Sequence, residues 1–279
     1  MWYKMPMALA GRARAVGRLA VFAIGSWLVV ARAIRTVLAR FPDRWRLESP
    51  HVSRWARLGA RCLGIRVRRT GELPPPGSLV VANHQTYADI VTLGGLFPSI
   101  FAARHDMRRW PLFGALAASG ATIFIDRERK RAGARGIEKV QQALAVGATV
   151  IGFPEGTSTD GRDLLPFRSG LFHAAVETGA PVVPAAIRYL EIDGAPIAEG
   201  EREVVAWYRG EPFLHHLMRF ASHSSVLAEV EIGAPIAGPH AGRRELAAAA
   251  EAALREMLRL PRAAAPAAGD EAVELEVGR

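Results

Sequence analysis

His84 and Asp89 are the residues of this 279-residue chain whose types and spacing point most directly to acid–base chemistry. A histidine works as a general base near neutral pH when a carboxylate holds its tautomer and stabilises the imidazolium ion. Helical neighbours lie three or four positions apart, so a pair five apart can meet only across a loop or a distorted turn. The pair alone is also typical of a loop histidine followed by a helix-capping aspartate. Other features must decide between these interpretations.

Sequence motifs for several other chemistries are missing. The chain contains no Gly-x-Ser-x-Gly elbow, no Gly-x-x-x-x-Gly-Lys phosphate loop and no Gly-x-Gly-x-x-Gly dinucleotide turn. The other histidines form no zinc-like spacing with Cys62 or with the carboxylates. A nucleophilic serine, a nucleotide and a metal are therefore unsupported. What remains is a histidine base that activates a hydroxyl group of the substrate.

Short β-rich runs alternate with helical patterns along the chain. The expected strands are residues 63–69, 78–82, 100–103, 122–125, 149–153, 182–188, 203–208 and 226–232. The expected helices lie around residues 137–144 and over residues 170–178 and 242–260. Strands separated by helices predict an α/β fold with a mostly parallel sheet covered by helices on both faces.

Three polar motifs each follow an apolar run. The motifs are residues 83–89, 126–127 and 155–157, and the runs before them are residues 79–81, 123–125 and 150–153. In parallel sheets, ligands bind beyond the carboxyl ends of the strands. We therefore expect the three loops to line one pocket.

The N-terminal segment carries the positive charge. Residues 1–70 hold fifteen Lys or Arg and only two acids, within a chain of net charge +9. Residues 19–31 are uncharged, but thirteen helical residues reach only about 20 Å, short of a bilayer core of about 30 Å. We expect a basic, amphipathic or apolar helical anchor that lies on the membrane or re-enters it. A cleaved signal peptide and a soluble core helix with a basic outer face are the alternatives.

These features predict three regions: a membrane-anchoring segment over residues 1–62, a catalytic domain over 63–260 and a disordered tail over 261–279. The single cysteine, Cys62, excludes an internal disulfide and agrees with a reducing compartment. The expected location is the cytoplasmic face of the inner membrane. Because the basic excess lies on a segment with an apolar run, membrane lipids are expected as partners and nucleic acid is not.

Four ordered blocks resemble the glycerolipid acyltransferases, specifically the bacterial 1-acylglycerol-3-phosphate O-acyltransferase type. The blocks are NHQTYAD at 83–89, FIDR at 124–127, FPEGTS at 153–158 with FRSG at 167–170, and VVPAA at 182–186. Together they span roughly residues 75–190. The resemblance implies transfer of an acyl group from acyl-CoA or acyl carrier protein to the free hydroxyl of 1-acylglycerol-3-phosphate, giving phosphatidic acid. It implies no metal and no bound cofactor beyond the acyl donor.

The resemblance also implies roles for single residues. His84 would take the hydroxyl proton, and Asp89 would orient the imidazole and stabilise its charged form. Arg127 would bind the acceptor phosphate, because a guanidinium stays charged and can make a bidentate contact. The substrate-binding loop would comprise Glu155, Gly156 and Thr157. For Glu155 a structural role, tying the loop together through backbone hydrogen bonds, is an equal alternative.

One position departs from the family pattern. Many relatives have arginine where this chain has Ser158, so the loop has one cation fewer for a phosphate. Either Arg162 or Arg168 replaces that charge, or the acceptor has no phosphomonoester. A lyso-ornithine lipid or another lysolipid is therefore an alternative acceptor, and a non-catalytic lipid-binding module is the alternative to an enzyme.

Overall fold

The computed structural model describes residues 9–38, 44–109, 121–126, 129–208, 210–236 and 242–261. Within these ranges the strands form a single eight-stranded sheet. Its strands are β1 (Ile65–Thr70), β2 (Leu79–Ala82), β3 (Ile100–Arg104), β4 (Ile123–Ile125), β5 (Val150–Gly152), β6 (Val182–Ile192), β7 (Ala195–Pro196) and β8 (Val226–Ile232).

The sheet has the order β1-β8-β6-β2-β5-β3-β4, and β7 pairs with β6. β8 runs antiparallel to β6, whereas the other neighbours along this order are parallel. The central strand β2 consists of four buried aliphatic residues, as expected for a strand covered on both faces. Because β2, β4 and β5 are parallel members of one sheet, the loops that follow them leave from the same edge.

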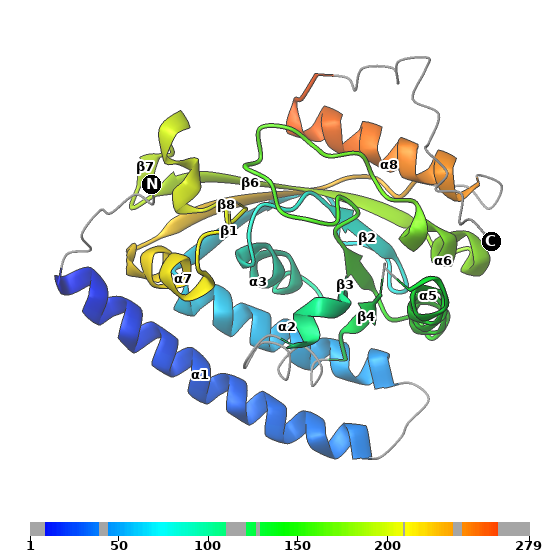
Figure 1. The fold of residues 1–279 in the computed structure, drawn as a ribbon, viewed down its shortest axis with the longest axis horizontal. Helices are drawn as coiled ribbons and strands as arrows, with labels where there is room; N and C mark the ends of the chain where they lie inside the picture. Colours follow the sequence, from blue (N-terminus) through cyan, green and yellow to red (C-terminus); the bar gives the residue numbers. More distant parts are fainter. Residues whose placement is uncertain are drawn as a thin grey trace, which may run out of the picture.

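Helices cover both faces of the sheet. They are α1 (Leu9–Leu38), α2 (Arg44–Cys62), α3 (Ala88–Gly94), α5 (Lys130–Ala145), α6 (Gly170–Thr178), α7 (Phe213–Ser222) and α8 (Arg243–Leu258), with short 3-10 helices η1 (His105–Arg109) and η2 (Glu199–Val204). Figure 1 shows α6 and α8 on one side of the sheet and α1, α2, α3 and α7 on the other. Alternate residues of β2 follow this division: Leu79 packs with residues of α5, α6 and α8, and Val80 packs with residues of α2 and α3. The predicted α/β fold with a mostly parallel, helix-covered sheet is confirmed.

One expected strand is wrong. Residues 203–208 comprise the end of η2 and an irregular segment after it. Val205 and Ala206 are buried there, which explains the apolar pattern. The backbone N–H of Trp207 donates to the carbonyl oxygen of Gln85 (2.9 Å) instead of joining a strand ladder. An apolar run that crosses the loop around His84 thus resembles a strand in sequence.

The helix α1 packs along the rest of the protein. Its Arg18 donates to the carbonyl oxygens of Ala221 (3.2 Å) and Ser224 (2.9 Å), and Arg14 donates to that of Ser222 (2.8 Å). These contacts satisfy carbonyl groups at and just beyond the C-terminal end of α7, where a helix leaves them unpaired. The arginines that raise the charge of this segment therefore also fasten α1 to α7.

Among the described residues, no helix is both long and apolar enough to cross a membrane. The expected anchor, which lies on the membrane or re-enters it, remains a prediction. Of the expected tail, residues 262–279 lie outside the described residues. The region boundaries at residues 62 and 260 also remain predictions.

Candidate active site

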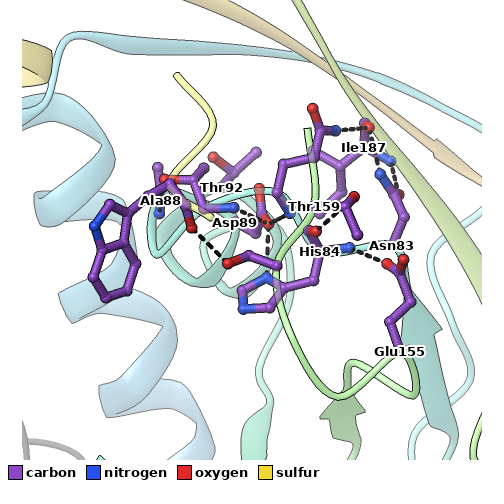
Figure 2. Close-up of polar contacts among 12 residues, drawn as sticks. Asn83, His84, Ala88, Asp89, Thr92, Glu155, Thr159 and Ile187 are labelled. Carbon is purple, nitrogen blue, oxygen red and sulfur yellow. Dashed lines mark hydrogen bonds and ion pairs between the residues drawn. The ribbon is translucent and has the colours of Figure 1, made fainter. Parts of the chain in front are cut away.

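His84 and Asp89 meet at the edge of the sheet where β2 ends. His84 lies in the loop after β2, and Asp89 lies in the first turn of α3. The imidazole Nδ1 of His84 is 2.8 Å from Oδ2 of Asp89 (Figure 2). Asp89 is fully buried, whereas 22% of the His84 side chain is exposed. With Nδ1 bound to a carboxylate, the neutral imidazole keeps its lone pair on Nε2, which is the arrangement of a general base.

Three further donors bind the Asp89 carboxylate. The backbone N–H groups of Gln85 (2.7 Å) and Thr86 (2.9 Å) donate to Oδ2, and the hydroxyl of Tyr189 donates to Oδ1 at 2.8 Å. Burial disfavours a charge, but hydrogen bonds to the carboxylate favour its ionised form. The donors therefore make an ionised carboxylate tenable in a site without solvent contact.

Glu155 braces the histidine loop from the neighbouring strand. Its Oε1 accepts the backbone N–H of His84 (2.7 Å), and its Oε2 accepts that of Leu165 (3.0 Å). Burial raises the pKa of this carboxyl group to about 7, although the two backbone hydrogen bonds oppose the shift. The contacts of Glu155 are those of the structural alternative considered from the sequence: the side chain ties together the loops that follow β2 and β5.

Strand β6 holds the same loop from the other side. The side-chain amide of Asn83 exchanges hydrogen bonds with the backbone of Ile187 (3.0 and 2.8 Å), as Figure 2 shows. The side-chain amide of Gln85 also donates to the carbonyl oxygen of Ile187 (2.9 Å). These hydrogen bonds explain why amide side chains on both sides of His84 are buried.

A cavity of about 300 Å³ opens beside His84. Its walls include the predicted residues Gly156 and Thr157, together with Ser158. Most of the remaining lining is apolar or aromatic: Tyr87, Ile90, Phe101, Ala102, Ala103, Met107, Phe153, Trp207 and Tyr208. The ring of Phe153 stacks on the imidazole of His84 with 4.2 Å between centroids. An imidazole base at the wall of an apolar cavity suits a substrate with long hydrocarbon chains.

The other predicted substrate-binding residues are not all in this cavity. Arg168 lines a second cavity, also about 300 Å³, together with Asp126, Pro154 and Gly170. Arg127 lies outside the described residues. Arg162, the other candidate to replace the missing cation, has its guanidinium 3.9 Å from the carboxylate of Asp160. The three-loop pocket expected from the sequence is thus divided, in the described part of the chain, between two cavities.

The sequence reasoning missed two features of the site. Arg104 and Asp106 line the His84 cavity and form a bidentate ion pair, with contacts of 3.0 and 2.8 Å. Tyr189 contacts Asp89 from a strand one hundred positions away, so no local spacing reports it. For Arg104 a signal existed, because the residue directly follows the expected strand at 100–103.

Among the described residues, no group of three His, Cys, Asp or Glu is placed to hold a metal ion. The expectation that the site needs no cofactor remains untested.

The comparisons with known proteins all relate this chain to acyltransferases. The family model described as Acyltransferase matches residues 64–188. The chain is 34% identical over 213 residues to a lyso-ornithine lipid O-acyltransferase of Rhizobium meliloti, covering 73% of each protein. It is 30% identical over 250 residues to the protein of that name from Brucella abortus, covering 83% of this chain and 93% of the relative. A 1-acyl-sn-glycerol-3-phosphate acyltransferase of Neisseria gonorrhoeae is 36% identical over 141 residues, or 49% of this chain and 54% of the relative.

One solved structure shares the fold. The crystal structure of the 1-acyl-sn-glycerophosphate acyltransferase from Thermotoga maritima aligns with a TM-score of 0.61, covering 89% of this chain and 96% of that chain. The sequence identity is 20%, so the likeness concerns the fold alone.

Proposed function

The chain belongs to the acyltransferase family, and from this premise we propose that it transfers a fatty acyl group from a thioester, acyl-CoA or acyl carrier protein, to the free hydroxyl of a lysolipid. The observation that carries the proposal is the contact of 2.8 Å between His84 and the buried Asp89 at the wall of an apolar cavity.

In the proposed reaction, Nε2 of His84 takes the proton of the lysolipid hydroxyl as its oxygen attacks the thioester carbonyl carbon. The carbon–oxygen bond of the new ester forms, the carbon–sulfur bond breaks, and His84 returns the proton to the departing thiolate. Asp89 keeps Nδ1 protonated and stabilises the transient imidazolium ion. No acyl-enzyme is needed, because the nucleophile belongs to the substrate.

For the acceptor we propose a lyso-ornithine lipid. The two relatives of that name align with 73% and 83% of this chain, against 49% for the Neisseria gonorrhoeae 1-acyl-sn-glycerol-3-phosphate enzyme. Among the described lining residues of the His84 cavity, Arg104 is the one Lys or Arg, and Asp106 pairs with it. An ornithine headgroup carries both a carboxylate and an ammonium group. It therefore needs less positive charge from the protein than a phosphomonoester does.

The second candidate acceptor is 1-acylglycerol-3-phosphate, which would make the product phosphatidic acid. Its support is the 36% identity to the Neisseria gonorrhoeae enzyme and the FIDR block that contains Arg127. The Arg168 cavity would supply a further cation for the phosphate.

We also propose that α1 lies on the cytoplasmic face of the inner membrane. Val21, Ile24 and Trp27 are exposed apolar residues on this helix, and Arg12 and Arg14 are exposed basic ones. Apolar side chains that enter the interface and cations that meet anionic headgroups are the two contributions to such binding. This location would place the cavity near a two-chain product that partitions into the bilayer.

The acceptor is tested by measuring thiol release from acyl-CoA and from acyl carrier protein, with lyso-ornithine lipid and 1-acylglycerol-3-phosphate offered separately. The proposal predicts a higher kcat/KM for the lyso-ornithine lipid. A higher value for the phosphate acceptor would assign the second candidate. Binding of both lipids with no thiol release from folded protein would instead indicate a lipid-binding module without catalysis.

A further inference from the structure

We infer that Tyr189 is a positioning residue that acts on His84 through the Asp89 carboxylate. The inference rests on the proposed function, because it adds a residue to the same site. Tyr189 lies on β6, and its hydroxyl donates to Oδ1 of Asp89 at 2.8 Å. Oδ2 of Asp89 accepts a hydrogen bond from Nδ1 of His84 at 2.8 Å. The two oxygens of one carboxylate therefore connect the strand to the base.

The contact on Oδ1 fixes the rotation of the carboxylate. The backbone N–H groups of Gln85 and Thr86 hold Oδ2, and they come from the same loop as His84. They therefore tie the carboxylate to that loop, which Asn83 and Gln85 attach to β6 through the backbone of Ile187. In the described part of the chain, Tyr189 is the partner recorded for Oδ1, and it belongs to the sheet. Its hydroxyl therefore holds the Asp89 carboxylate in a fixed orientation relative to the sheet, which is a rigid element.

Strand β6 is suited to this role because it contacts the site at two positions, through the backbone of Ile187 and through the side chain of Tyr189. Ile187 and Tyr189 are two residues apart, so their side chains point to the same side of the sheet. The backbone of Ile187 exchanges two hydrogen bonds with Asn83. The pairing of β6 with β8 shifts register between Tyr189 and Glu191, and such irregularities re-aim side chains next to active sites.

Tyr189 acts as a neutral donor at ordinary pH. Burial, and next the charge of Asp89, raise the pKa of its phenol well above the usual range. The hydroxyl of Thr92 lies 3.4 Å from the phenol oxygen, a weak contact that leaves the bond to Asp89 in place. In the described part of the chain, the titratable neighbours are His84, which pairs with Asp89, Tyr87, which acts on Tyr189, and Glu155 on the loop after β5.

Loss of the phenol hydroxyl has two consequences with known signs. Without a donor on Oδ1, the Asp89 charge is less neutralised and attracts the imidazolium ion more strongly, which raises the pKa of His84. The carboxylate can also rotate, so the base spends less time aligned with the substrate hydroxyl. A residue that only stabilises the fold would produce neither effect in the folded protein.

The test is the Tyr189→Phe variant in the full-length protein. We expect kcat to fall about tenfold, since one hydrogen bond to a charged group corresponds to roughly 1.5 kcal/mol. KM for both substrates should stay within about twofold of wild type, and the acidic limb of the kcat/KM profile should move to higher pH. Thr178→Val is the control, because it removes a hydroxyl that bonds the Ala174 carbonyl oxygen on the distant α6. It should keep the wild-type kcat and pH profile.

An NMR titration of the His84 imidazole, assigned with His84→Ala, separates this inference from the proposed function. It reads the pKa of His84 without substrate, and the value should be higher in Tyr189→Phe. Wild-type kcat together with an unmoved His84 pKa would overturn the inference, even if acyl transfer is established. A lower kcat with unmoved pKa and unmoved acidic limb would also overturn it, because it would show a structural effect alone. The NMR titration also decides the inference if no acceptor gives turnover. An unmoved His84 pKa in Tyr189→Phe would then overturn the inference. A raised His84 pKa would support the positioning contact and show that the assigned reaction, not the contact, is wrong.

Discussion

At the scale of single residues, the proposed chemistry depends on which nitrogen of His84 carries the proton. Asp89 determines this, because its buried carboxylate accepts from Nδ1 and leaves Nε2 as the base. The same carboxylate is the acceptor for two backbone N–H groups of the loop. The tautomer of His84 and the shape of its loop are therefore set by one group.

Asp89→Asn tests what the charge of this carboxylate contributes. An asparagine keeps one acceptor oxygen, which the backbone N–H groups of Gln85 and Thr86 place at the Oδ2 position beside Nδ1 of His84, but it has no negative charge to stabilise the imidazolium ion. We expect kcat to fall by about 10³-fold or more, with a much smaller change in KM. The comparison is Asp163→Asn, which removes a carboxylate that pairs with Arg255 outside the His84 cavity. Similar losses in both variants would show that Asp89 has no special role in the reaction.

The raised pKa of Glu155 predicts how the stability of the folded protein depends on pH. Burial raises its pKa to about 7 from an ordinary value of 4.5. Because the folded pKa is the higher one, the associated stabilisation is complete below pH 4.5 and is lost as the pH rises through 7. The loss should be at most about 3 kcal/mol. Urea unfolding between pH 5 and 8 measures it, and Glu155→Gln, which does not titrate, should show a flatter profile. Parallel profiles for the two proteins would contradict the assignment.

At the scale of elements, the site is a loop clamped between two strands. Glu155 after β5 and Ile187 on β6 hold the loop that follows β2, from opposite sides. Gly161 lets another segment pass close to this loop: its φ is +74°, and a Cβ there would lie 2.3 Å from Oε1 of Gln85. Close packing of the loops that follow β2 and β5 therefore requires glycine at this position.

Gly161→Ala should combine backbone strain with a clash. We expect a loss of unfolding free energy of about 2 kcal/mol or more and a lower kcat, because the displaced Gln85 amide also bonds Ile187. Gly179→Ala is a matched control with φ +66° and open space around the new Cβ. It should lose only about 1 kcal/mol and keep its kcat. Equal effects of the two changes on kcat would exclude a packing role for Gly161 in the site.

The elements differ in how far the sequence predicts them. The helix at Gly170–Thr178 was predicted with its observed bounds, and the buried β2 was predicted within one residue, because local periodicity and flanking glycines determine both. The contact of His84 with Asp89 was implied by the family resemblance, because the spacing of five residues alone also fits a loop histidine followed by a helix-capping aspartate. The partners Tyr189 and Ile187 could not be predicted from spacing, since β6 reaches the loop only through the order of strands in the sheet. The wrong strand at 203–208 has the same cause: Val205 is buried in a cluster with residues distant in sequence, such as Ala15, Ala56 and Ala88.

At the scale of the whole molecule, α1 and the cavity both present apolar side chains, which suits a lipid substrate. α1 exposes apolar side chains, and the cavity beside His84 is lined mainly by apolar ones. Arginines of α1 bond the carbonyl groups around the end of α7, so the helix is attached to the domain that holds the cavity. A membrane-bound α1 would thus hold the cavity close to the bilayer.

The double variant Val21→Asp with Ile24→Asp tests the membrane role of α1. The two side chains are 55% and 66% exposed, so the fold should tolerate the change. Sedimentation with vesicles of anionic phospholipid should fall at least about tenfold, because two apolar groups that would enter the interface become charged. Leu73→Asp is the control, since Leu73 is 50% exposed but lies outside α1. Undiminished sedimentation of the double variant would exclude this face of α1 as the membrane contact.

The central claim is that His84 drives acyl transfer to a lysolipid hydroxyl, and thiol release from a long-chain acyl-CoA in the presence of lyso-ornithine lipid measures it most directly. Wild-type protein and His84→Ala are compared after circular dichroism has shown that both are folded. We predict turnover by the wild type and a fall to background in the variant. Full turnover by folded His84→Ala would contradict the claim, because the hydroxyl would then be activated by another group.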